Sequence, residues 1–203
     1  MVIKSVMSEE VHSEHCRRCK EQVRRLLTAV YGGCLAGYSF PWPASPEQYQ
    51  KTIIGDALRQ ILMALQQSRG HKDFVKSAQM PPCDFYVPDP AFILEFDESQ
   101  HFTQARCVTF SLYPPGIEMG FSIERWSNLC RVIDAKDDDP PDRDERRAWY
   151  DTLRDLVPTL HGMKPTVRLC WNEFSWCSLD SGSRGDREIF RSLLEQRLPR
   201  MGK

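Results

Sequence analysis

Hydrophobic residues recur at helical spacing in several stretches of the chain. Over residues 16–31, Val23, Leu26 and Val30 fall on one face of a predicted helix, and two glycines follow as a stop signal. Similar spacing predicts further helices over residues 46–70, 123–135 and 144–157, and a last helix that Asp186 caps and that continues to Leu194.

Shorter runs of β-branched and aromatic residues predict strands. Residues 84–87 and 91–96 flank a Pro-Asp-Pro turn and so form a β-hairpin, residues 166–171 form another strand, and residues 107–113 are expected to be extended. Helices that flank a hairpin-containing sheet predict a mixed α/β fold. The length of 203 residues fits one domain, with residues 1–45 as an N-terminal helical extension and residues 46–203 as the core.

Three acidic residues gather at the predicted hairpin. Glu95 and Asp97 end its second strand, and because strand side chains alternate, both point to the face opposite Phe96. Antiparallel pairing places Asp84, near the start of the first strand, close to Glu95. Three converging carboxylates repel one another unless a cation neutralises them, and such oxygen ligands suit Mg²⁺ or Mn²⁺.

A simpler interpretation of these acids stays open, because strand ends are often solvated and acidic, and structural ion pairs are common. The residues that follow favour a functional site. Gln100 and His101 place an amide and an imidazole beside the acids. A histidine this close to a metal ligand suits a proton shuttle or a phosphate contact.

The motif as a whole resembles a known superfamily. The sequence DF at residues 84–85, ILEFDE at 93–98 and QHF at 100–102 is similar to the PD-(D/E)XK restriction-endonuclease-like proteins, and among them to the very-short-patch-repair-like endonucleases. The likeness extends over residues 56–171, with looser flanks. It implies an α/β fold with a restriction-endonuclease-like mixed β-sheet flanked by helices, and a Mg²⁺-dependent endonuclease that hydrolyses DNA.

The resemblance also implies roles for individual residues. Asp84 and Glu95 would hold Mg²⁺. Asp97 stands where the superfamily usually has a lysine, so activation of the attacking water would fall to Asp97, to His101 or to a metal-bound water. Gln100 lies within the same candidate catalytic segment.

Two further positions follow from the same likeness. Glu98 replaces the glycine that usually follows the second acid, which adds negative charge beside the substrate. The superfamily often carries an acidic residue on the helix before the hairpin, and Asp56 is the candidate here, with Glu47 and Glu21 as alternatives. Because the usual lysine is absent, a non-catalytic member of the same fold that binds nucleic acid or a protein stays open as the alternative function.

The N-terminal segment contains a second candidate metal site. Cys16 and Cys19 form a Cys-x-x-Cys pair, a spacing that zinc sites use because one turn brings two thiolates to the same side of the ion. Further ligands would have to come from other residues of the chain, and the candidates are His12, His15, Cys34, Cys170 and Cys177. Two buried thiols on a helix face are the alternative.

Overall charge restricts the function less than local charge does. Lys and Arg number 27 against 28 Asp and Glu, a net charge of −1, which argues against a bulk polyanion binder but allows local basic surfaces. Arginines in the first helix and in the 144–157 region could contact DNA phosphates, although charge runs are usually solvated. We find no signal peptide and no long apolar run, so a cytoplasmic protein with no membrane association is expected, and a homodimer stays open.

Overall fold

The computed structural model describes residues 17–198 and shows a mixed α/β fold. Its sheet has four strands in the order β1-β2-β3-β4: β1 (Leu35–Ala36), β2 (Phe85–Val87), β3 (Phe92–Asp97) and β4 (Val167–Cys170). The first three strands pair antiparallel and β4 pairs parallel to β3. The predicted hairpin is therefore confirmed, with Phe85 opposite Leu94.

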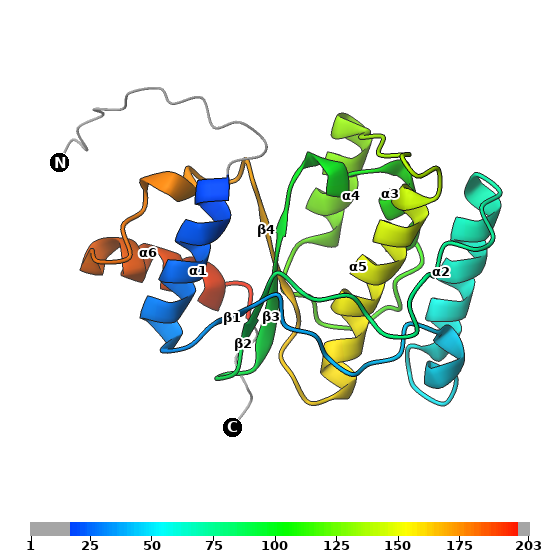
Figure 1. Cartoon of the computed structure of the whole chain (residues 1–203). Coiled ribbons are helices and arrows are strands. Elements are labelled where there is room, and N and C mark those ends of the chain that lie inside the picture. Colours follow the sequence, from blue (N-terminus) through cyan, green and yellow to red (C-terminus); the bar gives the residue numbers. More distant parts are fainter. Residues whose placement is uncertain (1–16, 199–203) are drawn as a thin grey trace.

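Helices cover both faces of this sheet (Figure 1). One face carries α1 (Arg17–Tyr31) and α6 (Arg184–Glu195), and the other carries α3 (Gln104–Phe110), α4 (Ile123–Ile133) and α5 (Arg143–Leu160), with α2 (Gly55–Ser68) packed outside α3 and α5. Three short 3₁₀ helices connect these elements: η1 (Pro46–Tyr49), η2 (Ser99–His101) and η3 (Trp176–Ser178). The predicted helices at 16–31, 123–135 and 144–157 correspond to α1, α4 and α5.

Alternation along β3 divides the hydrophobic core between the two faces. Phe92, Leu94 and Phe96 pack into the cluster beneath α1 and α6, whereas Ile93 packs against α2 and α5. All six residues of β3 are buried. Glu95 and Asp97 therefore project from the same side as Ile93, which places two acids under α5 and its neighbours.

The helix predicted over residues 46–70 is interrupted. Residues 46–49 form η1, and α2 begins only at Gly55. The chain folds back between them, so that a Cβ atom at Gly55 would collide with the carbonyl oxygen of Tyr49. Pro46 does begin a helical turn, as predicted, but that turn ends at Tyr49. The helix does not continue, because α2 packs beside η1.

Two other local predictions are wrong. Residues 107–113 are not extended, because α3 runs to Phe110. Its N-cap is Thr103, whose hydroxyl accepts a hydrogen bond from the Arg106 amide. Burial of one helical face overrides the β propensity of this segment. The last helix is capped by Ser183, not by Asp186, whose amide donates to the serine hydroxyl within the first turn.

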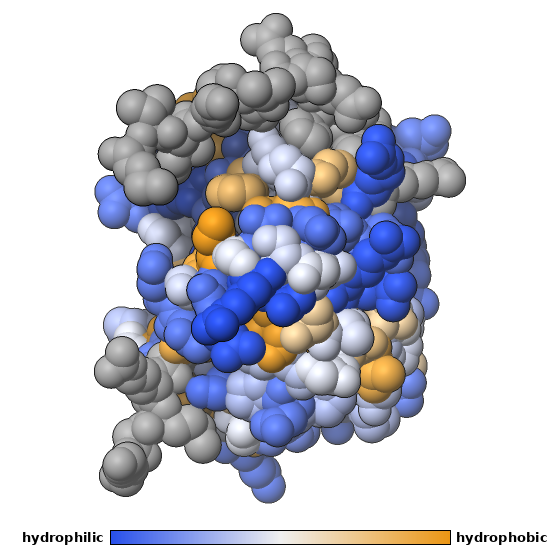
Figure 2. Space-filling model, turned by 90° about the vertical axis from the view of Figure 1, so that its left-hand side faces the viewer, coloured by the Kyte–Doolittle hydropathy of each residue, from blue (hydrophilic) through white to orange (hydrophobic). Residues whose placement is uncertain are grey.

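The surface over α1 and α6 is mainly hydrophilic, with smaller hydrophobic areas between the charged side chains (Figure 2). Of the helices in residues 17–198, none combines the length and the apolar character needed to cross a bilayer.

Candidate active site

A pocket of about 400 Å³ opens where the start of β2, the second half of β3 and α5 meet. Asp84, Glu95 and His101, three of the residues that the sequence singled out, line it. Asp84 directly precedes β2, and Glu95 lies on the neighbouring strand at the position next along the hairpin register. The expected proximity of Asp84 to Glu95 is confirmed.

The Asp84 and Glu95 carboxylates are held by each other's main chain. The Asp84 amide donates to Glu95 Oε1 at 3.1 Å, and the amide of Phe96 donates to Asp84 Oδ2 at 2.9 Å. Each carboxylate also faces a cation: Lys20 Nζ of α1 lies 3.2 Å from Asp84 Oδ1, and Arg154 Nε of α5 lies 3.5 Å from Glu95 Oε1. This arrangement fixes both acids at the pocket wall.

Burial dominates the electrostatics of Glu95. The residue is 4% exposed, and burial raises its pKa to about 7, with Asp84 adding to the effect and Arg154 opposing it. None of the described residues donates a hydrogen bond to its second oxygen, and Arg154 Nε is itself buried without a hydrogen-bond partner. Glu95 is a carboxylate whose negative charge is incompletely compensated within the folded chain.

Asp97 projects from the same face of β3 as Glu95 but lies outside the pocket. Its two oxygens accept hydrogen bonds from Trp126 Nε1 and from Arg168, each at 2.7 Å, and the residue is 1% exposed. Arg168 in turn pairs with Asp155 and Asp151. The expectation that Asp84, Glu95 and Asp97 share one cation is therefore wrong for Asp97, because buried partners already satisfy both of its oxygens.

His101 reaches the pocket from η2. Its Nδ1 lies 3.0 Å from Asp151 Oδ2 of α5 and 3.6 Å from Asp97 Oδ1. Burial disfavours the charged ring, but Asp151 and then Asp97 outweigh that effect and raise the pKa of His101 above its ordinary value. Since Asp151 holds Nδ1 and no described residue bonds to Nε2, the second ring nitrogen is free to act on a ligand.

The α5 wall of the pocket is basic. Four arginines line it: Arg143, Arg146, Arg147 and Arg154. Arg143 and Arg147 pair with Asp137 and Arg154 pairs with Asp151, whereas no carboxylate in residues 17–198 pairs with Arg146. The wall therefore presents a guanidinium group that is available to an anion.

The remaining sequence candidates lie elsewhere. The Gln100 amide donates to Glu98 and its carbonyl accepts from Arg147, outside the pocket lining. Asp56 is 85% exposed and pairs with Arg59 near η1, in a separate hollow that Glu47 also lines. Glu21 pairs with Arg24 and Arg25 on α1. Neither the first choice nor its two alternatives supplies the additional acid.

Sequence reasoning missed Asp151 and Tyr150, which α5 adds to the lining. A usable signal existed, because Arg147, Asp151 and Arg154 follow one another at the four- and three-residue spacing of a single helix face. Because the helix was interpreted as a solvated charged surface, Asp151 was not considered as a site residue.

Within residues 17–198, no three or more His, Cys, Asp or Glu side chains are grouped so as to hold a metal ion. Cys16 lies outside the described residues, and Cys19 is on α1, remote in sequence from the hairpin. Comparison of the chain with protein-family models, with curated proteins and with solved structures finds no match.

Proposed function

We propose that this chain is a metal-dependent nuclease of restriction-endonuclease-like fold, which hydrolyses DNA phosphodiester bonds in the pocket between β3 and α5. The observation that carries the proposal is the convergence of Asp84, Glu95 and His101 in one pocket with a basic wall. Two acids can hold a metal ion, an imidazole can transfer a proton, and guanidinium groups can stabilise phosphate charge, and each of these functions serves phosphodiester hydrolysis. The sequence motif that joins these acids supports the same assignment.

Asp84 and Glu95 fit a divalent cation of the Mg²⁺ or Mn²⁺ type. Proteins bind Mg²⁺ through one or two carboxylates, with water and substrate phosphate completing the shell, so a third acid is not required. One oxygen of Glu95 receives no hydrogen bond from the described residues, and burial raises its pKa to about 7. Both features are expected of a carboxylate that a bound cation would stabilise. The bound cation would polarise the phosphate and lower the pKa of water.

His101 is the candidate for proton transfer. Asp151 fixes its Nδ1 at 3.0 Å, which orients the ring and leaves Nε2 for the nucleophilic water or the leaving oxygen. The absent lysine of the superfamily is replaced in this proposal by the His101–Asp151 pair, not by Asp97, whose oxygens are occupied.

The basic wall of α5 would hold the phosphate backbone. Guanidinium groups pair with phosphate oxygens in a bidentate manner and position the duplex without reading its sequence. Arg146 is the best placed of the four because no described carboxylate neutralises it. A local site of this kind is compatible with the net charge of −1, since binding depends on the field of the pocket and not on the whole chain.

A non-catalytic nucleic-acid-binding protein is the second candidate. The observation in its favour is that Lys20 faces Asp84 and Arg154 faces Glu95, so the chain itself supplies cations at both acids. In that case the pocket would bind phosphate through its arginines and cleave nothing.

Cleavage of supercoiled plasmid and of single-stranded DNA, with Mg²⁺ or Mn²⁺ and with a chelator, separates the two candidates. We expect metal-dependent nicking by the wild-type chain and none by Asp84→Asn or Glu95→Gln, with DNA binding preserved in both variants. Asp56→Asn is the matched control, because its carboxylate is exposed and outside the pocket. Binding without cleavage under all metal conditions would contradict the nuclease and support the binding protein.

A further inference from the structure

Two cysteines that are remote in sequence meet on the opposite side of the sheet from the pocket. The Sγ atoms of Cys19, in the first turn of α1, and Cys177, in η3, lie 2.9 Å apart, although the two positions are 158 residues apart in the sequence. This separation exceeds the length of a disulfide bond by only roughly 0.9 Å. A small rotation of either side chain would bring the two sulfurs to bonding distance.

We propose that Cys19 and Cys177 form a reversible disulfide that fastens α1 to η3, and that a small-molecule disulfide such as oxidised glutathione generates it. In the first step the Cys177 thiolate attacks one sulfur of the reagent, so that a mixed disulfide forms and one thiolate leaves. The Cys19 thiolate then attacks Cys177 Sγ and displaces the second thiolate. The two protein thiols lose two protons and two electrons, and the reagent becomes two thiols.

Burial assigns the order of these two steps. Cys177 is partly exposed, so a reagent in solution can reach its sulfur. Cys19 is 4% exposed and lies in the hydrophobic cluster beneath α1 and α6, where a bulky reagent has no access. Its sulfur is nevertheless in contact with that of Cys177, which is the position that a resolving thiol needs.

The other thiols that the sequence left open are placed away from this pair. Cys170 packs with Phe102 and Trp126 in a separate cluster on the opposite face of the sheet. Cys34 follows the far end of α1, whose axis rises about 18 Å between Cys19 and Tyr31 at 1.5 Å per residue. Burial raises the pKa of the Cys34 and Cys170 thiols to about 11, which makes both slow to react.

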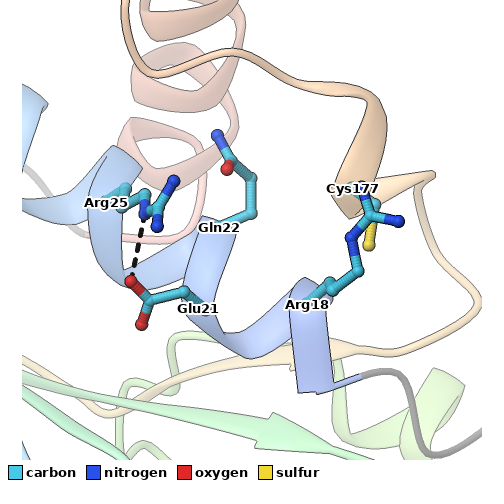
Figure 3. Close-up of a pocket in the computed structure, with 5 residues that line it drawn as sticks. All are labelled: Arg18, Glu21, Gln22, Arg25 and Cys177. Carbon is cyan, nitrogen blue, oxygen red and sulfur yellow. Dashed lines mark hydrogen bonds and ion pairs between the residues drawn. The ribbon is translucent and has the colours of Figure 1, made fainter.

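A hollow beside Cys177 gives the reagent a place to bind. Cys177 lines it together with four residues of the polar side of α1, namely Arg18, Glu21, Gln22 and Arg25 (Figure 3). Its volume is about 380 Å³. The two arginines favour a reagent that carries carboxylates, as oxidised glutathione does, and a cationic, partly exposed setting is typical of reactive cysteines.

Packing holds the main chain at both thiols in place. Trp176, directly before Cys177, is 1% exposed, and its Nε1 donates to the carbonyl of Cys170 in β4 at 3.0 Å. Cys19 belongs to the same hydrophobic cluster as Trp176. The bond would therefore form without rearrangement of the fold, and it would close a loop of 158 residues. The disulfide does not depend on catalysis, since it would tie α1 to the core of a nuclease or of a binding protein alike.

Oxidation of the purified full-length chain with oxidised glutathione, followed by peptide mass spectrometry without reductant, tests the proposal. We expect a linked Cys19–Cys177 peptide that dithiothreitol separates. Cys19→Ser should retain one glutathione on Cys177, because the resolving thiol is absent. Cys177→Ser should leave Cys19 unmodified, because that thiol is buried. Cys34→Ser, which changes another partly exposed thiol, is the control and should form the linked peptide as the wild-type chain does.

Thermal denaturation of the wild-type chain keeps the test valid if the serine variants fail to fold. The oxidised chain should melt roughly 5–15 °C above the reduced chain, because a bond that closes so long a loop restricts the unfolded state. Three results would each overturn the proposal: thiols that stay reduced, an unchanged melting temperature, or a disulfide between Cys19 and Cys16 in place of the one to Cys177.

Discussion

Asp84 and Glu95 each accept a hydrogen bond from the main chain that carries the other. The Asp84 amide donates to Glu95 at 3.1 Å, and the amide that follows Glu95 donates to Asp84 at 2.9 Å. The hairpin therefore fixes the position of both carboxylates before any ligand arrives. Side chains that are already positioned avoid the entropy cost of ordering when a ligand binds.

Divalent metal should stabilise the chain through these two acids. With Mg²⁺ or Mn²⁺ at ten times its dissociation constant, binding to the folded state adds about 1.4 kcal/mol to the free energy of unfolding. Thermal denaturation should show this shift in the wild-type chain and in the exposed control Asp56→Asn. Asp84→Asn and Glu95→Gln should show none. An unchanged shift in both variants would place the metal elsewhere.

Ionisation of Glu95 should lower the free energy of unfolding of the metal-free chain at high pH. Burial raises its pKa to about 7, above the value near 4.5 of the unfolded chain, so between these limits the folded state binds more protons. The contribution of this group is most favourable below pH 4.5 and is lost as the pH rises through 7. Glu95→Gln, which stays neutral, should raise the free energy of unfolding at pH 8 by on the order of 2–3 kcal/mol.

Chemical denaturation at two pH values measures this effect. At pH 4 the Glu95→Gln gain should nearly vanish, because the wild-type carboxyl is then protonated in both states. Glu188→Gln on the exposed surface of α6 is the control and should change stability by less than about 0.5 kcal/mol at either pH. A gain of equal size at both pH values would contradict the assignment to ionisation.

The hairpin and its acids could be predicted from the sequence because their signals are local. Alternation along residues 91–96 and the proline turn fix the pairing, and the pairing fixes Asp84 beside Glu95. The same alternation correctly put Asp97 on the face of Glu95. It could not show that Arg168 and Trp126 donate hydrogen bonds to the Asp97 carboxylate, since these partners come from β4 and α4.

Errors in the helices have a similar origin. The break between residues 46–49 and α2 depends on the contact of Gly55 with Tyr49, and the helical state of Phe110 depends on its burial beside Phe121 and Trp126. Packing between one segment and the next decided these elements, and the spacing of hydrophobic residues within a single segment does not record such packing. The meeting of Cys19 with Cys177 is likewise invisible in the sequence.

Asp97→Asn should destabilise the fold and spare metal binding. Asp97 is 1% exposed and pairs with Arg168, so loss of its charge leaves a buried guanidinium with only Asp151 and Asp155 as ion-pair partners. We expect the free energy of unfolding to fall by about 2–3 kcal/mol. Loss of the metal-induced thermal shift without loss of stability would instead make Asp97 a ligand.

Asp151→Asn should lower the pKa of His101. The Asp151 carboxylate, at 3.0 Å from Nδ1, is the main opponent of the burial that would otherwise keep the ring neutral. Titration of the ring by NMR measures the change, with Asp56→Asn as the control. Because the pKa of His101 lies above its unfolded value, stability from the pair is full below about pH 6.5 and is lost as the pH rises further. An unshifted ring in Asp151→Asn would show that another group holds the proton.

Arg146→Ala should weaken DNA binding through the loss of one phosphate contact. Arg146 lines the pocket, and within residues 17–198 no carboxylate pairs with it, so its charge is available to a phosphate oxygen. Affinity should fall at low salt, and the slope of the logarithm of the binding constant against that of the salt concentration should become shallower by about one. Fluorescence anisotropy over a salt series measures both. Arg59→Ala, which removes an exposed arginine beside Asp56, should leave the slope unchanged. Equal effects of the two variants would mean that DNA responds to overall charge and does not enter this pocket.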